Sequence, residues 1–405
     1  MIPGLSISRP GAVLALLLAV NLLNYLDRQV LYSLLPLIQT DLFLTDAQAG
    51  KLASAFMIVY MFAAPPIGYW ADRGSRRLWI AMGIALWSLA TAASGLAPGY
   101  RSLFAARAAV GIGESCYGAI SPSFIAEHFP ASKRGSVLAV FSMAIPVGSA
   151  LGYIAGGSLG EHWGWRNAFF LVSLPGLALA LLSLALSEPR SRALSEPQPG
   201  PGAYLDLFSV PSFLIVTLAG AAMTFALGGF AVWMPSFFHR EWGWGVGRAG
   251  MVFGAITVAS GIAGSLAGGW LADWALKFTR KAYFLVSGLG LFIGLPLAVA
   301  AVLCPAPSVS LGLLFGAEFF LFLNMGPLNA IIVSVTKPSC RSMAFAANIF
   351  VIHALGDAIS PAIIGELSDH FGLKIALLMA SSTLGAAAGL CFWGTRHYER
   401  DASYA

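Results

Sequence analysis

Apolar runs of about twenty residues recur along the whole chain, and they constrain its fold more than any other feature. Of the 405 residues, 58% are hydrophobic and only 10% are charged, whereas soluble domains carry roughly a quarter of charged residues. In lipid every backbone polar group must find a partner within the protein, and helices satisfy this requirement within one segment. The sequence therefore predicts an all-α integral membrane protein.

The apolar pattern predicts twelve transmembrane helices in two six-helix bundles. The longest polar break runs from Ser187 to Asp206 and is rich in proline and glycine, which is typical of a linker. We therefore expect an N-terminal bundle at 1–187, a cytoplasmic linker at 188–208 and a C-terminal bundle at 209–405. The expected helices lie at residues 10–39, 46–71, 77–97, 101–127, 134–160, 165–187, 209–238, 247–274, 281–303, 308–336, 341–366 and 371–394.

The distribution of basic residues predicts the orientation of the chain. Most of the 23 lysines and arginines fall in loops on the side of the N-terminus, which places both termini in the cytoplasm. This pattern also accounts for the net charge of +5, so we do not expect nucleic-acid binding. Arg9 before the first apolar run faintly resembles a signal peptide, but no Ala-x-Ala-like cleavage site follows, which favours a retained first helix.

The sequence contains no motif that predicts a cofactor, a metal site or an enzyme. The four cysteines are scattered over different segments, without the paired spacing of a zinc site or a disulfide framework. There is also no phosphate-binding loop and no hydrolase or metalloprotease motif. We expect no catalytic residues and no bound cofactor or metal.

The two halves of the chain resemble each other at a constant spacing of 208 residues. Gly148 corresponds to Gly356, and Gly164 corresponds to Gly372. Shared apolar composition cannot produce agreement at glycine and polar positions. Two parallel six-helix repeats are typical of secondary transporters, with the substrate site near the bilayer midplane between the halves.

The run from Gly68 to Arg77 joins the second and third predicted helices and is the most specific motif in the chain. It resembles the cytoplasmic loop signature of the major facilitator superfamily. Its core recurs from Gly269 to Asp273, but the basic turn does not follow there. One interpretation is a cytoplasmic gate, and the alternative is that the loop cations only set topology. The expected gate residues are Gly68, Asp72, Arg73, Arg76, Arg77, Glu127, Arg134 and Asp273.

Four ionisable residues fall inside the predicted helices of the first half. Asp27 and Arg28 are adjacent in the first helix, while Arg107 and Glu114 lie about two turns apart on one face of the fourth. Ionisable groups at membrane depth cost several kcal/mol and usually face a cavity or a partner. The four charges sum to zero, which makes their burial together tolerable. A carboxylate beside a guanidinium can exchange a proton as its partner moves, which favours proton coupling, although a static ion-pair network is the alternative.

The whole chain resembles a major facilitator superfamily transporter, and residues 24–28, 107–114, 129–135 and 353–361 are similar to the spinster-type lipid transporters. This resemblance implies alternating-access transport of lysophospholipids or sphingosine-phosphate-like lipids, coupled to protons. It also implies proton coupling at Asp27 and head-group contact at Arg107 and Glu114. His353 can change charge near neutral pH, although a hydrogen-bonding role is equally consistent with its position. The expected proton-coupling residues are Asp27, Glu114 and His353, and the expected substrate-binding residues are Arg28, Arg107, Glu114, Tyr60 and Asn324.

The sequence leaves three functions open. The leading hypothesis is a monomeric, proton-coupled transporter of lysolipid-like amphiphiles in a bacterial inner membrane, with membrane lipids and protons as its other partners. An exporter of small organic anions or amphiphilic drugs would use the same fold and the same buried charges. A lipid sensor that does not transport is less favoured, because the sequence shows no output domain beyond short loops.

Overall fold

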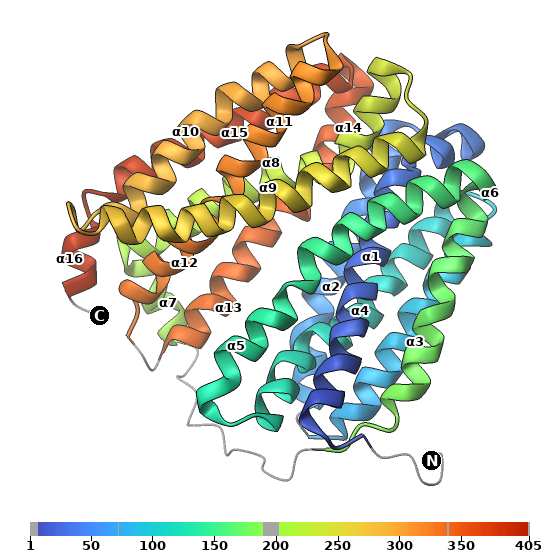
Figure 1. The fold of residues 1–405 in the computed structure, drawn as a ribbon, viewed down its shortest axis with the longest axis horizontal. Coiled ribbons are helices and arrows are strands. Elements are labelled where there is room, and N and C mark those ends of the chain that lie inside the picture. The colour runs from blue at the N-terminus through green and yellow to red at the C-terminus, as the bar shows by residue number, and fades with distance from the viewer. Residues whose placement is uncertain (1–6, 72, 189–201, 338–339, 404–405) are drawn as a thin grey trace. The chain divides into compact units, whose positions relative to one another are not determined.

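The computed structural model describes residues 7–71, 73–188, 202–337 and 340–403, and nearly all of them are helical (Figure 1). The first part of the chain forms α1 (Pro10–Leu42), α2 (Asp46–Ala71), α3 (Arg76–Gly95), α4 (Tyr100–His128), α5 (Ala131–Ser142) and α6 (Ala144–Ser183). The prediction of an all-α membrane protein is confirmed. Most of the expected linker at 188–208 lies outside the described residues; the described part is Glu188 and residues 202–208, which belong to α7 (Gly202–Ser209).

The second part of the chain contains both long helices and interrupted ones. The uninterrupted helices are α8 (Pro211–Trp242), α9 (Val246–Ala275), α10 (Ala282–Leu303), α15 (Leu373–Gly394) and the short α16 (Tyr398–Ser403). The others are α11 (Pro307–Phe322), α12 (Met325–Ser334), α13 (Arg341–Ile352), a π-helical turn (His353–Asp357) and α14 (Ser360–Phe371).

Twelve membrane-spanning segments can be traced in the described residues. Ten helical stretches are long and apolar enough to cross a membrane. One of them, Ser136–Ser183, runs for 48 residues and is divided by the non-helical backbone of Gly164 (φ 80°, ψ 155°), so it provides two spans. The remaining span is α4, whose 29 residues are more polar because they include Arg107 and Glu114. The helix count agrees with the sequence prediction.

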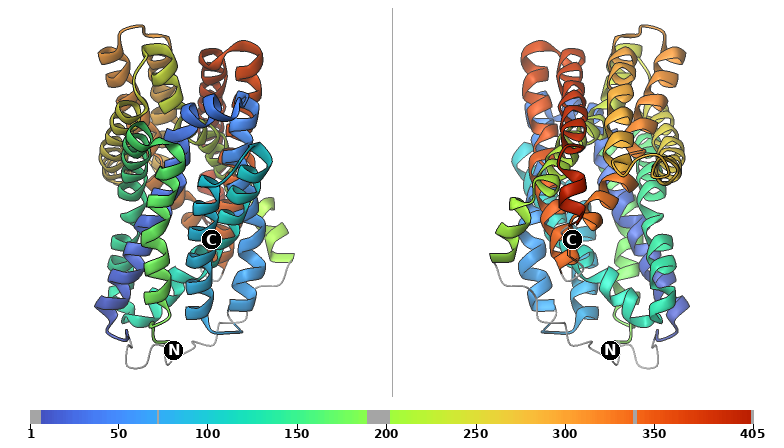
Figure 2. Two further views of the ribbon diagram at one scale, coloured as in Figure 1. Left: turned by 90° about the vertical axis from the view of Figure 1, so that its right-hand side faces the viewer. Right: turned by 90° about the vertical axis from the view of Figure 1, so that its left-hand side faces the viewer.

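The chain forms two compact units. The first contains residues 1–194 and 234–255, and the second contains 195–233 and 256–405, so the chain passes from one unit to the other inside α8 and inside α9. In the first unit, α1 packs along α6, while α2 and α3 both pack on α4. In the views of Figure 2, the blue and green helices of this unit run roughly along one direction. In the second unit, α10 packs on both α11 and α15.

Glycines bring α6 into close contact with α1. At Gly148 a β-carbon would lie 2.6 Å from the carbonyl oxygen of Leu22, and at Gly156 it would lie 2.9 Å from the backbone of Val30. Gly152, one turn from each, meets the α1 backbone in the same way. The glycines that recur every four residues in the fifth predicted span therefore form a helix-packing surface, as their spacing predicts.

The internal duplication is visible in the backbone. Gly372, which corresponds to Gly164, adopts almost the same conformation (φ 83°, ψ 151°). Before each glycine a histidine ring nitrogen lies 2.8 Å from a carbonyl oxygen four residues earlier, as His162 does with Ser158 and His370 with Glu366. Equivalent residues in the two halves thus build the same turn.

Two spans of the second unit are broken where the sequence predicts continuous helices. The expected helix at 308–336 is interrupted at Leu323 and Asn324, where the Asn324 amide nitrogen donates to the carbonyl oxygen of Phe320 at 2.6 Å. The expected helix at 341–366 contains the π-helical turn, in which Gly356 has a non-helical backbone. At these points other hydrogen bonds, from a side chain or from the backbone, replace the regular helical ones. Hydropathy does not predict where such replacements occur.

The C-terminal helix α16 contributes a cap to α8. The Asp401 carboxylate accepts a hydrogen bond from the backbone N–H of Ser212 at 2.9 Å, at the start of α8. Burial alone would raise the pKa of Asp401, but its hydrogen bonds with Ser212 and its interaction with Arg400 outweigh burial and leave the pKa below its usual value. The negative charge is favourable at a helix N-terminus.

Candidate functional site

The two adjacent charges of α1 bind different partners inside the first unit. The Asp27 carboxylate accepts a hydrogen bond from the Thr91 hydroxyl of α3 at 2.5 Å. The Arg28 Nε donates to the Glu114 carboxylate of α4 at 2.6 Å. Asp27 and Glu114 are almost fully buried, with 2% and 0% of their surfaces exposed. The helix therefore directs one charge toward α3 and its neighbour toward α4.

Aromatic rings surround the Arg28 guanidinium. Its central carbon lies 4.8 Å from the ring centre of Tyr25, 4.9 Å from that of Phe56 and 5.1 Å from that of Tyr60. These distances allow cation–π attraction, which is stronger where water is excluded. The predicted substrate residue Tyr60 therefore belongs to the same cluster. Gly118 of α4 makes room for its phenol, because a β-carbon there would collide with the Tyr60 hydroxyl.

Arg107 is the charged residue whose bonding capacity is least used in this cluster. Only 1% of its surface is exposed, and its Nε and one terminal nitrogen have no hydrogen-bond partner among the described residues. It lies near enough to Asp27 for the two charges to interact. One oxygen of Asp27 and one of Glu114 also lack a partner within the described part of the chain. The four predicted charges therefore lie in one unit, and some of their donors and acceptors have no partner among the described residues.

Two of the expected gate residues, Arg76 and Glu127, form an ion pair. Both carboxylate oxygens of Glu127 accept hydrogen bonds from Arg76, at 2.6 and 2.7 Å. Arg134, another of the expected gate residues, donates to the backbone carbonyl of Phe129 at 3.1 Å. Asp72 lies outside the described residues. The ion pair joins the start of α3 to the end of α4, both within the first unit.

Glu188 completes this loop, and sequence reasoning missed it. Its carboxylate accepts hydrogen bonds from the Ser75 hydroxyl and the Arg77 backbone N–H, both at 2.9 Å, and so caps α3. It also lies 3.9 Å from Arg76. A glutamate at the boundary of a proline-rich linker gives no sequence signal for this role.

Arg73, another expected gate residue, stacks over the ring of Tyr69, with 3.5 Å between its guanidinium carbon and the ring centre.

The remaining predicted gate residues have fewer interactions. A β-carbon on Gly68 would meet only the side chain of Ala119, at 3.9 Å, so this position permits ordinary helix contact. Asp273 is exposed at the end of α9, in the second unit.

The second unit brings two predicted site residues to irregular backbone. His353 and Asp357 frame the π-helical turn, and the Nδ1 of the histidine lies 2.7 Å from a carboxylate oxygen of the aspartate. Both are partly exposed, at 30% and 21% of their side chains. Asn324 is fully buried at the break between α11 and α12, and its carbonyl oxygen has no partner among the described residues. π-Helical turns are frequently found at functional sites.

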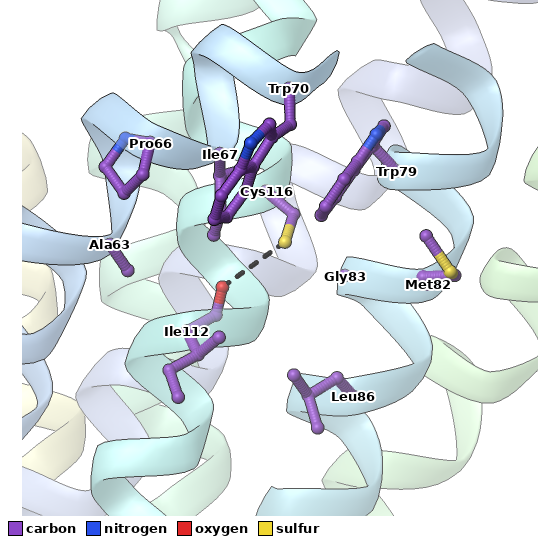
Figure 3. Close-up of a pocket in the computed structure, with 10 residues that line it drawn as sticks. All are labelled: Ala63, Pro66, Ile67, Trp70, Trp79, Met82, Gly83, Leu86, Ile112 and Cys116. Atoms are coloured by element: carbon purple, nitrogen blue, oxygen red, sulfur yellow. Dashed lines mark hydrogen bonds between the residues drawn. The ribbon is translucent and has the colours of Figure 1, made fainter. Parts of the chain in front are cut away.

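The first unit also has an apolar pocket between α2, α3 and α4 (Figure 3). Its volume is about 430 Å³, and Ile112 and Cys116 of α4 form part of its wall. Trp70 and Trp79 stack at one end, with ring centres 6.4 Å apart. The lining residues carry no charge, so this pocket alone cannot neutralise an anionic group. The buried charges described above remain the better candidate for polar recognition.

Comparisons with known proteins show which family the chain resembles. The family model of the Major Facilitator Superfamily matches residues 17–361. Protein spinster homolog 1 of Bos taurus is 33% identical, over 97% of this chain and 82% of its own length. The Homo sapiens protein of the same name is also 33% identical, with the same coverage of both chains.

Two solved structures share the fold. One is a bacterial homologue of the human lysosomal transporter spinster, with a TM-score of 0.89, 24% identity and coverage of 98% of this chain and 99% of that one. The other is a D-xylose–proton symporter, with a TM-score of 0.76, 20% identity and coverage of 95% and 98%.

Proposed function

Since the chain belongs to the Major Facilitator Superfamily and, within it, to the spinster family, we propose that it is a proton-coupled transporter of lysophospholipids or sphingolipid-like amphiphiles. Its relatives are transporters of this superfamily, so the chain is a multi-pass membrane transporter and not an enzyme. The proposal places a monomer in a bacterial inner membrane, with both termini in the cytoplasm.

The observation that carries the proposal is the buried guanidinium of Arg107, two nitrogens of which have no partner in the described part of the chain. A buried donor without a partner is unfavourable, and a charged one is more so. Guanidinium groups bind phosphate oxygens through parallel hydrogen bonds. The phosphate of a lysolipid or sphingosine-phosphate-like head group supplies the missing acceptors.

The position of Asp27 supports the proposal of proton coupling. Its carboxylate interacts with the charge of Arg107, and one of its oxygens has no partner in the described residues. An anion that binds Arg107 offsets the positive charge that favours ionised Asp27, and so promotes its protonation. Substrate and proton can therefore bind together without adding net charge to a buried site.

The proposal is tested by uptake into liposomes that contain the purified protein. We expect an imposed proton gradient to drive accumulation of a labelled lysolipid in preference to a panel of small organic anions. Preferential transport of the organic anions would instead support the exporter hypothesis, which relies on the same buried charges. Substrate binding without flux under any gradient would support the sensor hypothesis.

The coupling residue is tested by Asp27→Asn in the same liposomes. We expect this variant to lose proton-driven accumulation but to retain exchange of labelled for unlabelled lysolipid. Thr91→Val is the matched control, because it removes the hydroxyl that contacts Asp27 and leaves the carboxylate in place. Unchanged proton-driven accumulation in Asp27→Asn would contradict a coupling role.

A further inference from the structure

Another buried carboxylate, Glu318, lies in the second unit, remote in sequence from Asp27 and Glu114. Glu318 belongs to α11, and 1% of its surface is exposed. Its two carboxylate oxygens accept hydrogen bonds from side chains of α9, from the Ser260 hydroxyl at 3.1 Å and from the Thr257 hydroxyl at 3.4 Å. Two neutral donors therefore hold a side chain that is usually negative.

Among the described residues of the second unit, those of α8, α9, α10 and α12 bring no positive charge to Glu318; α9 carries Arg248 only in the part that belongs to the first unit. Within the second unit, α9 has one ionisable side chain, Asp273, which lies roughly 20 Å along the helix from Ser260. Tyr283 is the ionisable residue of α10, and it packs against the side-chain cluster that contains Leu323. Neither α12 nor residues 211–233 of α8 contain an ionisable side chain. No ion pair of Glu318 is found in the described residues.

A comparison with Glu114 shows how the surroundings of Glu318 affect its charge. Glu114 is equally buried but lies 2.6 Å from the Arg28 guanidinium, which balances its charge. An ionised carboxylate buried without a cation carries a large desolvation penalty, and such groups usually become neutral instead. Hydroxyl donors reduce this penalty but do not supply a countercharge.

We propose that Glu318 is a proton-binding site of the second unit, which carries its proton in the folded protein and is independent of Asp27. The step is simple: a carboxylate oxygen forms an O–H bond with a proton from water, and deprotonation returns that proton to water. The proposal goes beyond the proposed function, because it holds whichever substrate the protein carries.

Infrared difference spectroscopy of the full-length protein in lipid tests this assignment directly. The carbonyl stretching band of a protonated carboxyl is recorded while the pH is raised. We expect a band at neutral pH that is lost in Glu318→Gln. The exposed Glu399→Gln variant of the same unit is the matched control and should retain the band. Identical spectra for Glu318→Gln and the unmodified protein would overturn the proposal.

A second variant keeps the test informative if Glu318→Gln does not fold. Ser260→Ala removes the hydroxyl donor at 3.1 Å but retains the carboxyl group, so the band should persist at a shifted frequency. An unshifted band would assign the signal to another residue and contradict the proposal. The measurement is repeated with and without Na⁺ at constant pH, because a carboxylate with two hydroxyls can also bind that ion. Loss of the Glu318 band on addition of Na⁺ would overturn the proton assignment in favour of a cation site.

Discussion

At the scale of single residues, this protein uses two different ways to bury a carboxylate. Glu114 has a guanidinium partner within a ring of aromatic side chains, whereas the donors to Glu318 among the described residues are two hydroxyls. An ion pair in a low-dielectric site contributes little net stability, because desolvation offsets most of the attraction. Removing one partner alone is much more costly, since it leaves the other charge buried and uncompensated.

This difference predicts the behaviour of the Arg28–Glu114 pair in a double-mutant cycle. Glu114→Leu alone should lower the free energy of unfolding by about 3–5 kcal/mol, because it leaves Arg28 without its carboxylate. The double variant Arg28→Met/Glu114→Leu should recover most of this loss. The comparison is made by titration with a denaturing detergent. Additive effects of the two substitutions would mean that the side chains are not energetically coupled.

At the scale of elements, two equivalent glycines set the turns between the last two spans of each half. The backbone of Gly164 (φ 80°, ψ 155°) lies in a region that is essentially restricted to glycine. An added β-carbon would meet no atom within 4 Å, so a substitution here changes backbone strain without a clash.

Gly164→Ala should therefore destabilise the protein by about 1–3 kcal/mol through backbone strain alone. Gly389→Ala is the matched control, because a β-carbon at this position in α15 also meets no atom within 4 Å. Since Gly389 lies inside a regular helix, alanine there should be neutral or stabilising by about 0.5–1 kcal/mol. Both effects are measured as changes in the midpoint of unfolding in detergent. Equal behaviour of the two variants would exclude the backbone explanation.

The sequence could predict the elements better than their internal breaks. Long apolar runs and the repeated glycines are sufficient to place the helices and the matching turns at Gly164 and Gly372. The break at Asn324 and the π-helical turn depend on which side chain replaces a backbone hydrogen bond, which hydropathy does not encode.

The site was predictable in a similar, partial way. Four charged residues within apolar helices can be recognised from the sequence as site candidates, because charges are costly in lipid. Their pairing depends on the rotation and depth of each helix, so the sequence could not indicate that Arg28 binds Glu114 while Asp27 binds Thr91. Serine and threonine are common in membrane helices, so Thr91 and Ser260 give no signal until their partners are known.

At the scale of the whole molecule, both units contain buried carboxylates. Among the described residues, those of the first unit lie beside arginines, whereas Glu318 of the second unit has no cation partner. The first unit combines Asp27 and Glu114 with two arginines, while the buried Glu318 of the second has no ion-pair partner among the described residues. If the proposed function holds, recognition of an anion is therefore expected in the first unit. Neutral and apolar parts of a substrate need no such charge, so the two kinds of contact can be separated by experiment.

Substitution of Arg107 is expected to distinguish contacts with a charged head group from contacts with neutral parts of a substrate. Arg107→Ala should reduce transport of a lysolipid with a phosphate head group by about tenfold to a hundredfold, the value of one charged hydrogen-bonding contact. A neutral monoacylglycerol with the same acyl chain should be affected much less, because it offers no anion to the guanidinium. For the phosphate-bearing lysolipid, Arg107→Lys should transport at a rate between those of Arg107→Ala and the unmodified protein, since lysine keeps the charge but not the paired donors. Flux into liposomes of fixed composition measures all three, and equal losses for both lipids would make Arg107 a structural residue rather than a head-group contact.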